Sequence, residues 1–118
     1  MRASGYAEAA FVTWVEPENG AAGVFRDALV LARLSSPLDP TSLSAETFRI
    51  CDPAGLVPSS VELSRDQKVV IWRADRLLDP GVEHRVEADG LRDNRGRLVA
   101  PHRSRFFPGP LAFRDLVE

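Results

Sequence analysis

The stretch Leu77-Leu78-Asp79-Pro80-Gly81-Val82-Glu83-His84-Arg85-Val86-Glu87-Ala88 predicts a tight turn that leads into a strand with one buried face. Asp-Pro-Gly is typical of a turn, because proline presets φ and glycine accepts a positive φ. Successive side chains of a strand point to opposite faces. Val82, His84, Val86 and Ala88 are therefore expected in a core, and Glu83, Arg85 and Glu87 in water.

Turn sequences of this kind recur along the chain about every 8–15 residues, which is typical of a β-sandwich or β-barrel. The segments between them are rich in Val, Ile, Leu, Phe and Trp, which suit a half-buried pleated surface. A Ser-Leu-Ser-Ala-Glu sequence with an N-cap-like start predicts one helical turn over 42–46. The strands are predicted at 11–15, 28–34, 47–51, 60–63, 68–72, 82–88 and 103–107.

Four segments of the chain, in this order, resemble the Ig-like domain that occurs as repeats in bacterial surface-layer and cell-wall proteins. They are an opening Pro-Gly-Val turn at 16–24, a Pro-rich loop at 35–44, the Leu-x-x-Pro-Gly corner at 77–86 and an Asp-x-x-Gly hairpin at 90–98. The resemblance covers residues 15–107, roughly four-fifths of the chain. It implies an all-β, immunoglobulin-like β-sandwich of about seven strands with a structural or binding role.

The composition is that of one ordinary globular domain: 118 residues, 44% hydrophobic and 27% charged. A net charge of −2 gives no reason to expect a nucleic-acid partner, which requires a basic face. Cys51 is the only cysteine, so the sandwich has no intrachain disulfide and packing must stabilise it. We expect an N-terminal lead (1–10), the Ig-like sandwich (11–107) and an apolar C-terminal tail (108–118).

The polar residues of the sequence do not predict a chemical site. His84 stands where the family usually has a tyrosine, so we expect it to pack at a corner, and with His102 it forms no zinc-ligand spacing. Asp89, Asp93 and Asn94 could offer oxygens to calcium, but Asp and Asn in such turns mostly bond their own backbone. Copper carriers that share this sandwich rely on an amino-terminal histidine, and the chain begins Met1-Arg2-Ala3. No serine lies in Gly-x-Ser-x-Gly, so we expect no enzyme activity. For the reasons above we also expect no metal, and we expect no cofactor.

Two groups of apolar residues exceed what the sandwich needs. Strand 28–34 is apolar on both faces: Val30, Ala32 and Leu34 are expected in the core, which leaves Leu29 and Leu31 outside beside Arg33. The tail after the Pro-Gly-Pro break is too apolar for a solvated end of the chain. Its side chains either fold back onto the domain or bind a partner. The candidate partner-binding residues are Leu111, Phe113, Leu116 and Val117, with Leu29 and Leu31 as a second patch.

The sequence therefore predicts a non-catalytic structural or protein-binding module. We expect an accessory subunit docked on a larger bacterial assembly, for example a photosynthetic, respiratory or secretion complex in a membrane. No stretch is apolar for long enough to span a bilayer, and the first residues lack the pattern of a signal peptide. A cytoplasmic location, peripheral to a membrane complex through a partner, is expected. The alternative is a single Ig-like repeat of an exported adhesive or cell-wall protein, which would be extracellular.

Overall fold

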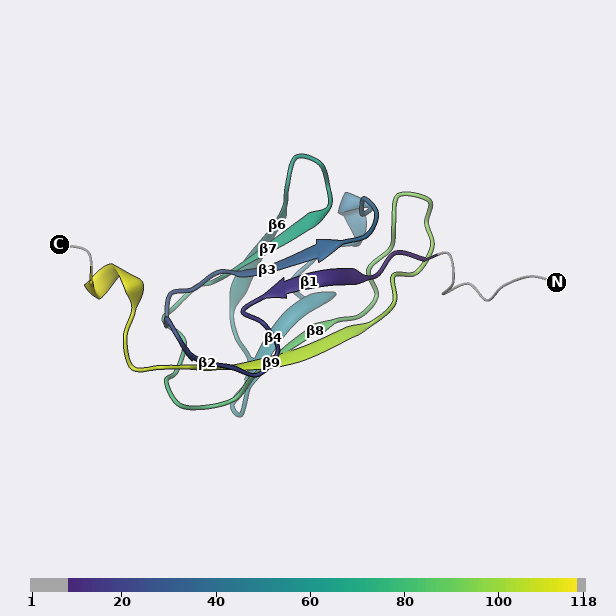
Figure 1. Cartoon of the computed structure of the whole chain (residues 1–118). Helices are drawn as coiled ribbons and strands as arrows, with labels where there is room; N and C mark the ends of the chain where they lie inside the picture. The colour runs from purple at the N-terminus through teal and green to yellow at the C-terminus, as the bar shows by residue number, and fades with distance from the viewer. Residues whose placement is uncertain (1–8, 117–118) are drawn as a thin grey trace.

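Two antiparallel-rich β-sheets pack face to face in the computed structural model, which describes residues 9–116 (Figure 1). One sheet has the order β1-β3-β7-β6 and the other the order β2-β9-β8-β4-β5. The chain therefore forms the predicted immunoglobulin-like β-sandwich. Its elements are β1 (Val12–Glu16), β2 (Ala21–Val24), β3 (Val30–Leu34), η1 (Pro40–Ser42), β4 (Phe48–Asp52), β5 (Gly55–Leu56), β6 (Ser59–Leu63), β7 (Val69–Ala74), β8 (His84–Ala88), β9 (His102–Pro108) and η2 (Phe113–Asp115).

The core lies between the sheets and is built by the alternation that the sequence shows. Val30, Ala32 and Leu34 of β3 are buried, as predicted, while Arg33 between them is exposed. Trp72 of β7 is fully buried and is the largest side chain of the core. The two layers therefore share one apolar interior, and their outer faces are left for other contacts.

Seven of the strands lie where the sequence predicts them, and β2 and β5 were not predicted. β2 lies within the segment interpreted as the opening turn, and two of its neighbouring glycines, Gly20 and Gly23, adopt positive φ. Its hydrogen-bond partner is the parallel strand β9, more than eighty residues away along the chain. A short edge strand that is stabilised by so distant a partner leaves little periodic signal in the sequence.

The short helix before β4 begins two residues earlier than the predicted turn over 42–46. The reason is Asp39, whose carboxylate accepts hydrogen bonds from the backbone N and the Oγ1 of Thr41 at 3.0 and 2.8 Å and so caps η1. Ala10, at the end of the predicted lead, lies in the core cluster. Residues 9–116 contain no helix of the length and apolar character needed to cross a membrane.

Candidate functional site

The C-terminal tail is fixed by its backbone to the domain's own loop between β2 and β3. Gly109 N donates to the carbonyl of Val24 at 2.8 Å, and Arg26 N donates to the carbonyl of Leu111 at 3.0 Å. Ala112 is fully buried between these contacts. The path of the tail backbone is therefore set by the sandwich.

Asp27 completes the attachment. One carboxylate oxygen accepts from the backbone N of Phe113 at 2.7 Å, and the other accepts from that of Arg114 at 3.1 Å. The carboxylate thus satisfies the first free N–H groups of η2, the role that an N-cap side chain plays within a helix. Burial alone raises the pKa of Asp27, but these two backbone bonds and the charge of Arg114 lower it, and the net pKa lies below the usual 3.8.

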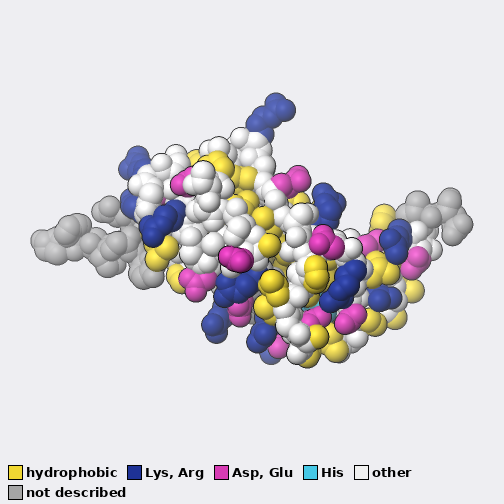
Figure 2. Space-filling model, turned by 180° about the vertical axis from the view of Figure 1, so that it is seen from behind, with side chains coloured by type: hydrophobic (Ala, Val, Ile, Leu, Met, Phe, Trp, Pro, Cys, Tyr) yellow, Lys and Arg dark blue, Asp and Glu magenta, His cyan; other side chains and the backbone are white. Residues whose placement is uncertain are grey.

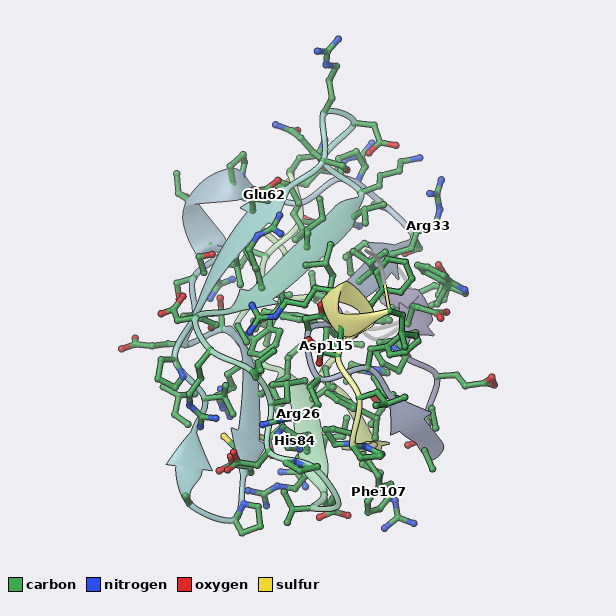
Figure 3. All side chains as sticks on the ribbon, turned by 90° about the vertical axis from the view of Figure 1, so that its left-hand side faces the viewer. Arg26, Arg33, Glu62, His84, Phe107 and Asp115 are labelled. Atoms are coloured by element: carbon green, nitrogen blue, oxygen red, sulfur yellow. The ribbon has the colours of Figure 1, made fainter. Side chains whose placement is uncertain are left out.

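The large side chains of this segment point outward. Leu111, Phe113 and Leu116 are 50%, 55% and 54% exposed, although the backbone that carries them is fixed. Phe25 meets Phe113 edge to face, with ring centroids 5.5 Å apart. Figure 3 looks onto this end of the molecule, with η2 in yellow, and Figure 2 shows hydrophobic side chains together with arginines at the same end. We call the set Phe25, Leu111, Phe113 and Leu116 the tail platform.

The structure shows how the tail is placed, which the sequence leaves open, and adds Phe25 to the candidate residues. The tail folds back onto its own domain through its backbone, yet three of its predicted apolar residues remain exposed; the fourth, Val117, lies outside the described residues. Phe25 was missed, because the loop 25–27 looks like an ordinary connection in the sequence. Its contact with Phe113 joins residues far apart in the chain, and no local signal could have indicated it.

Leu29 and Leu31 lie two residues apart at the start of β3 and have different neighbours. Leu29 lines a hollow of about 400 Å³ together with Arg114, so it lies next to the tail. Leu31 lies further along β3, half-buried on the outer face and opposite Ile71. Trp14 of β1, which the sequence analysis did not single out, is 46% exposed and lies opposite Arg33 on β3. Leu29 therefore lies next to the tail, and Leu31 lies on the outer face of the four-stranded sheet.

The buried Asp93 has its hydrogen-bond partners within its own hairpin. Asp93 is buried, and its oxygens accept from the backbone N of Arg95 and Arg97, both at 2.9 Å, and from Arg97 Nε at 3.0 Å. Burial raises the pKa of Asp93, but these hydrogen bonds and the charge of Arg97 lower it below its usual range. Asp93 thus bonds its own hairpin, as the sequence predicts for such a turn residue.

The two histidines lie at opposite ends of the paired strands β8 and β9. His84 is fully buried, stacks on Phe106 at 5.4 Å and lies 3.0 Å from the carbonyl of Val82 through Nδ1. His102 contacts Ser104 Oγ at 3.1 Å, and burial lowers its pKa. Within residues 9–116, no three His, Cys, Asp or Glu side chains lie close enough together to hold a metal ion.

Comparison with known proteins identifies the fold. No protein-family model matches the sequence, and a comparison with curated proteins finds no relative. Among solved structures, domains 1–6 of the surface layer protein SbsC match 89% of this chain with a TM-score of 0.66 and 18% identity. CopC from Methylosinus trichosporium OB3b matches 86% with a TM-score of 0.71 and 18% identity. An L,D-transpeptidase from Mycobacterium smegmatis matches 85% with a TM-score of 0.60 and 19% identity.

The share of each neighbour that is covered differs. The chain spans 14% of the SbsC structure and 40% of the transpeptidase, but 94% of the CopC chain. At these identities the likeness shows the fold alone. The sandwich is thus one that occurs both as a free-standing chain and as one unit of much longer bacterial proteins.

Proposed function

We propose that this chain is a non-catalytic protein-binding module that docks on a larger bacterial assembly through the tail platform. The observation that carries the proposal is the contrast between a fixed backbone and exposed apolar side chains. Asp27 and Arg26 hold the tail in place, while Phe113, Leu111 and Leu116 each keep half or more of their surface in water. A solitary domain gains nothing from ordering apolar groups outward.

The chemistry of the platform fits a protein partner. Interface energy concentrates in a few large side chains, and the pair of Phe25 and Phe113 provides two aromatic anchors already in contact. Because the backbone of the platform is ordered before binding, this chain loses less conformational entropy in docking. Arg114 and Asp115 lie beside the anchors on η2, where charge sets orientation more than affinity. The buried Asp93 and His84 are engaged in the hairpin and the core, which supports a non-catalytic role.

The location follows from the assembly. For an accessory subunit we propose a cytoplasmic location. If the assembly is a membrane complex, the subunit associates with it at the periphery. The partner then makes the membrane contact, and the sandwich contributes the platform alone.

The test compares two phenylalanines of similar exposure. Phe113→Ala removes an anchor of the platform, whereas Phe11→Ala removes a phenylalanine that is 51% exposed elsewhere. Tagged versions of each would be expressed in native cells, cross-linked, and the captured proteins quantified by mass spectrometry. We expect a defined set of partners that survives Phe11→Ala and is lost with Phe113→Ala. Equal recovery with both variants would contradict the proposal.

A second candidate function is a single Ig-like repeat of an exported adhesive or cell-wall protein. The observation in its favour is that the same fold occurs in SbsC, a surface layer protein by its title, as a small part of the chain. The beginning of the described chain, before β1, and η2 near its end also lie at opposite ends of the sandwich, which suits a unit strung between others (Figure 1).

One measurement separates the candidates. An antibody against the sandwich would show the size and compartment of the native protein after cell fractionation. A band near that of a 118-residue chain supports the accessory subunit. A much larger species at the cell surface supports the repeat, and the tail platform would then contact the neighbouring unit.

A further inference from the structure

The outer side of the five-stranded sheet carries a concentration of arginines that the fold does not require. Strands β4, β8 and β9, with Glu83 just before β8, place four arginines and two glutamates on this side, an excess of two positive charges in a chain of net charge −2. We call this surface the arginine face. It comprises Arg49, Arg85, Arg103, Arg105, Glu83 and Glu87.

Among the described residues 9–116, two of the four guanidinium groups have no partner. Arg49 Nη2 lies 3.0 Å from Glu87 Oε1, and Arg105 Nη1 lies 3.2 Å from Glu83 Oε2. Within residues 9–116, Arg85 and Arg103 have no hydrogen bond or ion pair through their side chains. The glutamates are therefore already engaged, and the excess charge resides on these two arginines.

The register leaves Arg85 facing a like charge, whereas Arg103 faces Glu87. Arg85 of β8 lies directly opposite Arg105 of β9. Like charges at directly opposed positions of an antiparallel pair destabilise it. An opposite charge placed between them would remove that repulsion, which is a reason to seek an anionic occupant.

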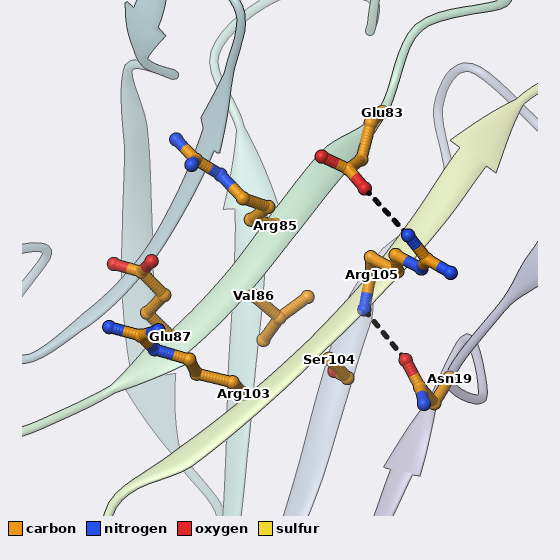
Figure 4. Close-up of a pocket in the computed structure, with 8 residues that line it drawn as sticks. All are labelled: Asn19, Glu83, Arg85, Val86, Glu87, Arg103, Ser104 and Arg105. Atoms are coloured by element: carbon orange, nitrogen blue, oxygen red, sulfur yellow. Dashed lines mark hydrogen bonds and ion pairs between the residues drawn. The ribbon is translucent and has the colours of Figure 1, made fainter.

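A shallow hollow separates the arginines (Figure 4). Its volume is about 370 Å³, and the backbone of Val86 and Ser104 lies at its floor, because both side chains point into the core. Figure 4 shows Arg85, Glu87 and Arg103 on one side of the hollow and Arg105 on the other. Arg105 Nη1 lies 3.2 Å from Glu83 Oε2, and the backbone N of Arg105 donates to Asn19 Oδ1 at 3.1 Å. An anion entering here would meet guanidinium groups from two strands.

We propose that the arginine face binds an extended acidic segment of a partner protein, with two carboxylates two residues apart, one on Arg85 and one on Arg103. Arg103 pairs with Glu87, so it is the diagonal neighbour of Arg85, about 7–8 Å away. In an extended chain the side chains of residues i and i+2 share a face and lie about 7 Å apart. The backbone spacing of the two arginines therefore matches that of the two acidic residues, and each guanidinium can bind a carboxylate with two parallel hydrogen bonds.

The glutamates argue for a protein rather than a continuous polyanion. Glu83, just before β8, and Glu87 on β8 flank Arg85 along the chain, so a polymer with a charge at every unit would meet a carboxylate on either side of it. A segment with alternating acidic and neutral residues avoids both. The proposal stands apart from the tail platform, because its residues belong to β8 and β9 and the tail is attached to the loop 24–27.

The direct test uses two short peptides of identical composition. Acetyl-Gly-Glu-Ser-Glu-Gly-amide has the i, i+2 spacing, and acetyl-Gly-Glu-Glu-Ser-Gly-amide places the two carboxylates on opposite faces of an extended chain. Binding to the whole protein would be followed by backbone amide NMR shifts. We expect shifts on β8 and β9 around Arg85 and Arg103, and tighter binding of the first peptide. Equal or tighter binding of the second peptide, or of inorganic polyphosphate, would show a general polyanion surface and overturn the proposal, as would no binding of the first.

Variants locate the binding. Arg85→Gln and Arg103→Gln should each lower the affinity for the first peptide by about tenfold. This is the effect of losing one charge-assisted hydrogen-bonded group. Arg85→Lys with Arg103→Lys keeps the charge but removes the bidentate geometry, and should also weaken binding. The matched control is Arg33→Gln with Arg65→Gln, two exposed arginines outside this face. Unchanged affinity in both Arg85 and Arg103 variants, or an equal loss in the control, would overturn the proposal.

Discussion

Replacing Asp27 by alanine tests whether one side chain keeps the tail platform in order. The carboxylate accepts two backbone hydrogen bonds, from Phe113 at 2.7 Å and Arg114 at 3.1 Å. A hydrogen bond to a charged group contributes about 1.5–3 kcal/mol in a protected site. Asp27 is half-buried and water competes for the same groups, so the value for a helix cap, about 1–2 kcal/mol for the pair, is the better guide. This loss of free energy should weaken the attachment of the tail and leave the core intact, because Asp27 is not part of the core.

Amide hydrogen exchange measured by NMR reports this loss directly. A free-energy change of about 1–2 kcal/mol alters a population by roughly 5–30-fold. The amides of Phe113 and Arg114 should therefore exchange roughly 5–30-fold faster in Asp27→Ala, and by less in Asp27→Asn, which keeps one acceptor oxygen. Asp75→Ala, in the same hollow, is the matched control and should leave both amides unchanged.

The same attachment should depend on pH with a defined sign. The folded pKa of Asp27 lies below the usual 3.8 of an aspartate, so folding favours the charged carboxylate. This contribution is fully present above 3.8 and is lost as the pH falls through the lower folded pKa. If the two amides exchange at the same rate in wild type and Asp27→Ala, with no added loss of protection at acid pH, the carboxylate does not hold the tail.

Three further substitutions test other parts of the structure. Trp72→Ala should cost about 3–5 kcal/mol of unfolding free energy in a denaturant titration, because the side chain is fully buried; a loss below about 1 kcal/mol would mean that it is not a core residue. Asp93→Ala should cost about 2–3 kcal/mol by the same assay at neutral pH, and the difference from wild type should shrink in acid, because the folded pKa of Asp93 is lowered; a constant difference would refute the hydrogen-bond account. Gly109→Ala should detach the tail, seen as faster exchange of the Phe113 amide, because its Cβ would lie 3.0 Å from the Cα of Gly23, and Pro110→Ala should not.

Local patterns in the sequence were sufficient to predict the inner faces of the sandwich. Val30, Ala32 and Leu34 on β3, and His84, Val86 and Ala88 on β8, are buried where the alternation places them. Each assignment needs only a strand and its period of two. The turn role of Asp93 was likewise predictable, because its partners lie within four residues along the chain.

Contacts between distant residues were not predictable. β2 forms by pairing with β9. The tail is held by Asp27, which lies 86 positions before Phe113 in the sequence. The sequence identified Phe113 as an apolar residue in an unusual place but could not show that its backbone is fixed. The arginine face has the same origin. The charges of β8 were expected in water, but the pairing of Arg85 with Arg105 depends on a register that no single strand encodes.

These long-range features carry the functional argument because the fold does not account for them. SbsC and CopC each share only 18% of aligned residues with this chain and keep the sandwich. Most side chains can therefore change without loss of the architecture, which requires apolar inner faces and workable turns. The sandwich does not require Phe25 and Phe113 to meet at the surface, nor, within residues 9–116, two arginines without an ion pair on adjacent strands. Both arrangements leave the isolated domain with exposed apolar area or uncompensated charge, and contact with other molecules would remove either cost.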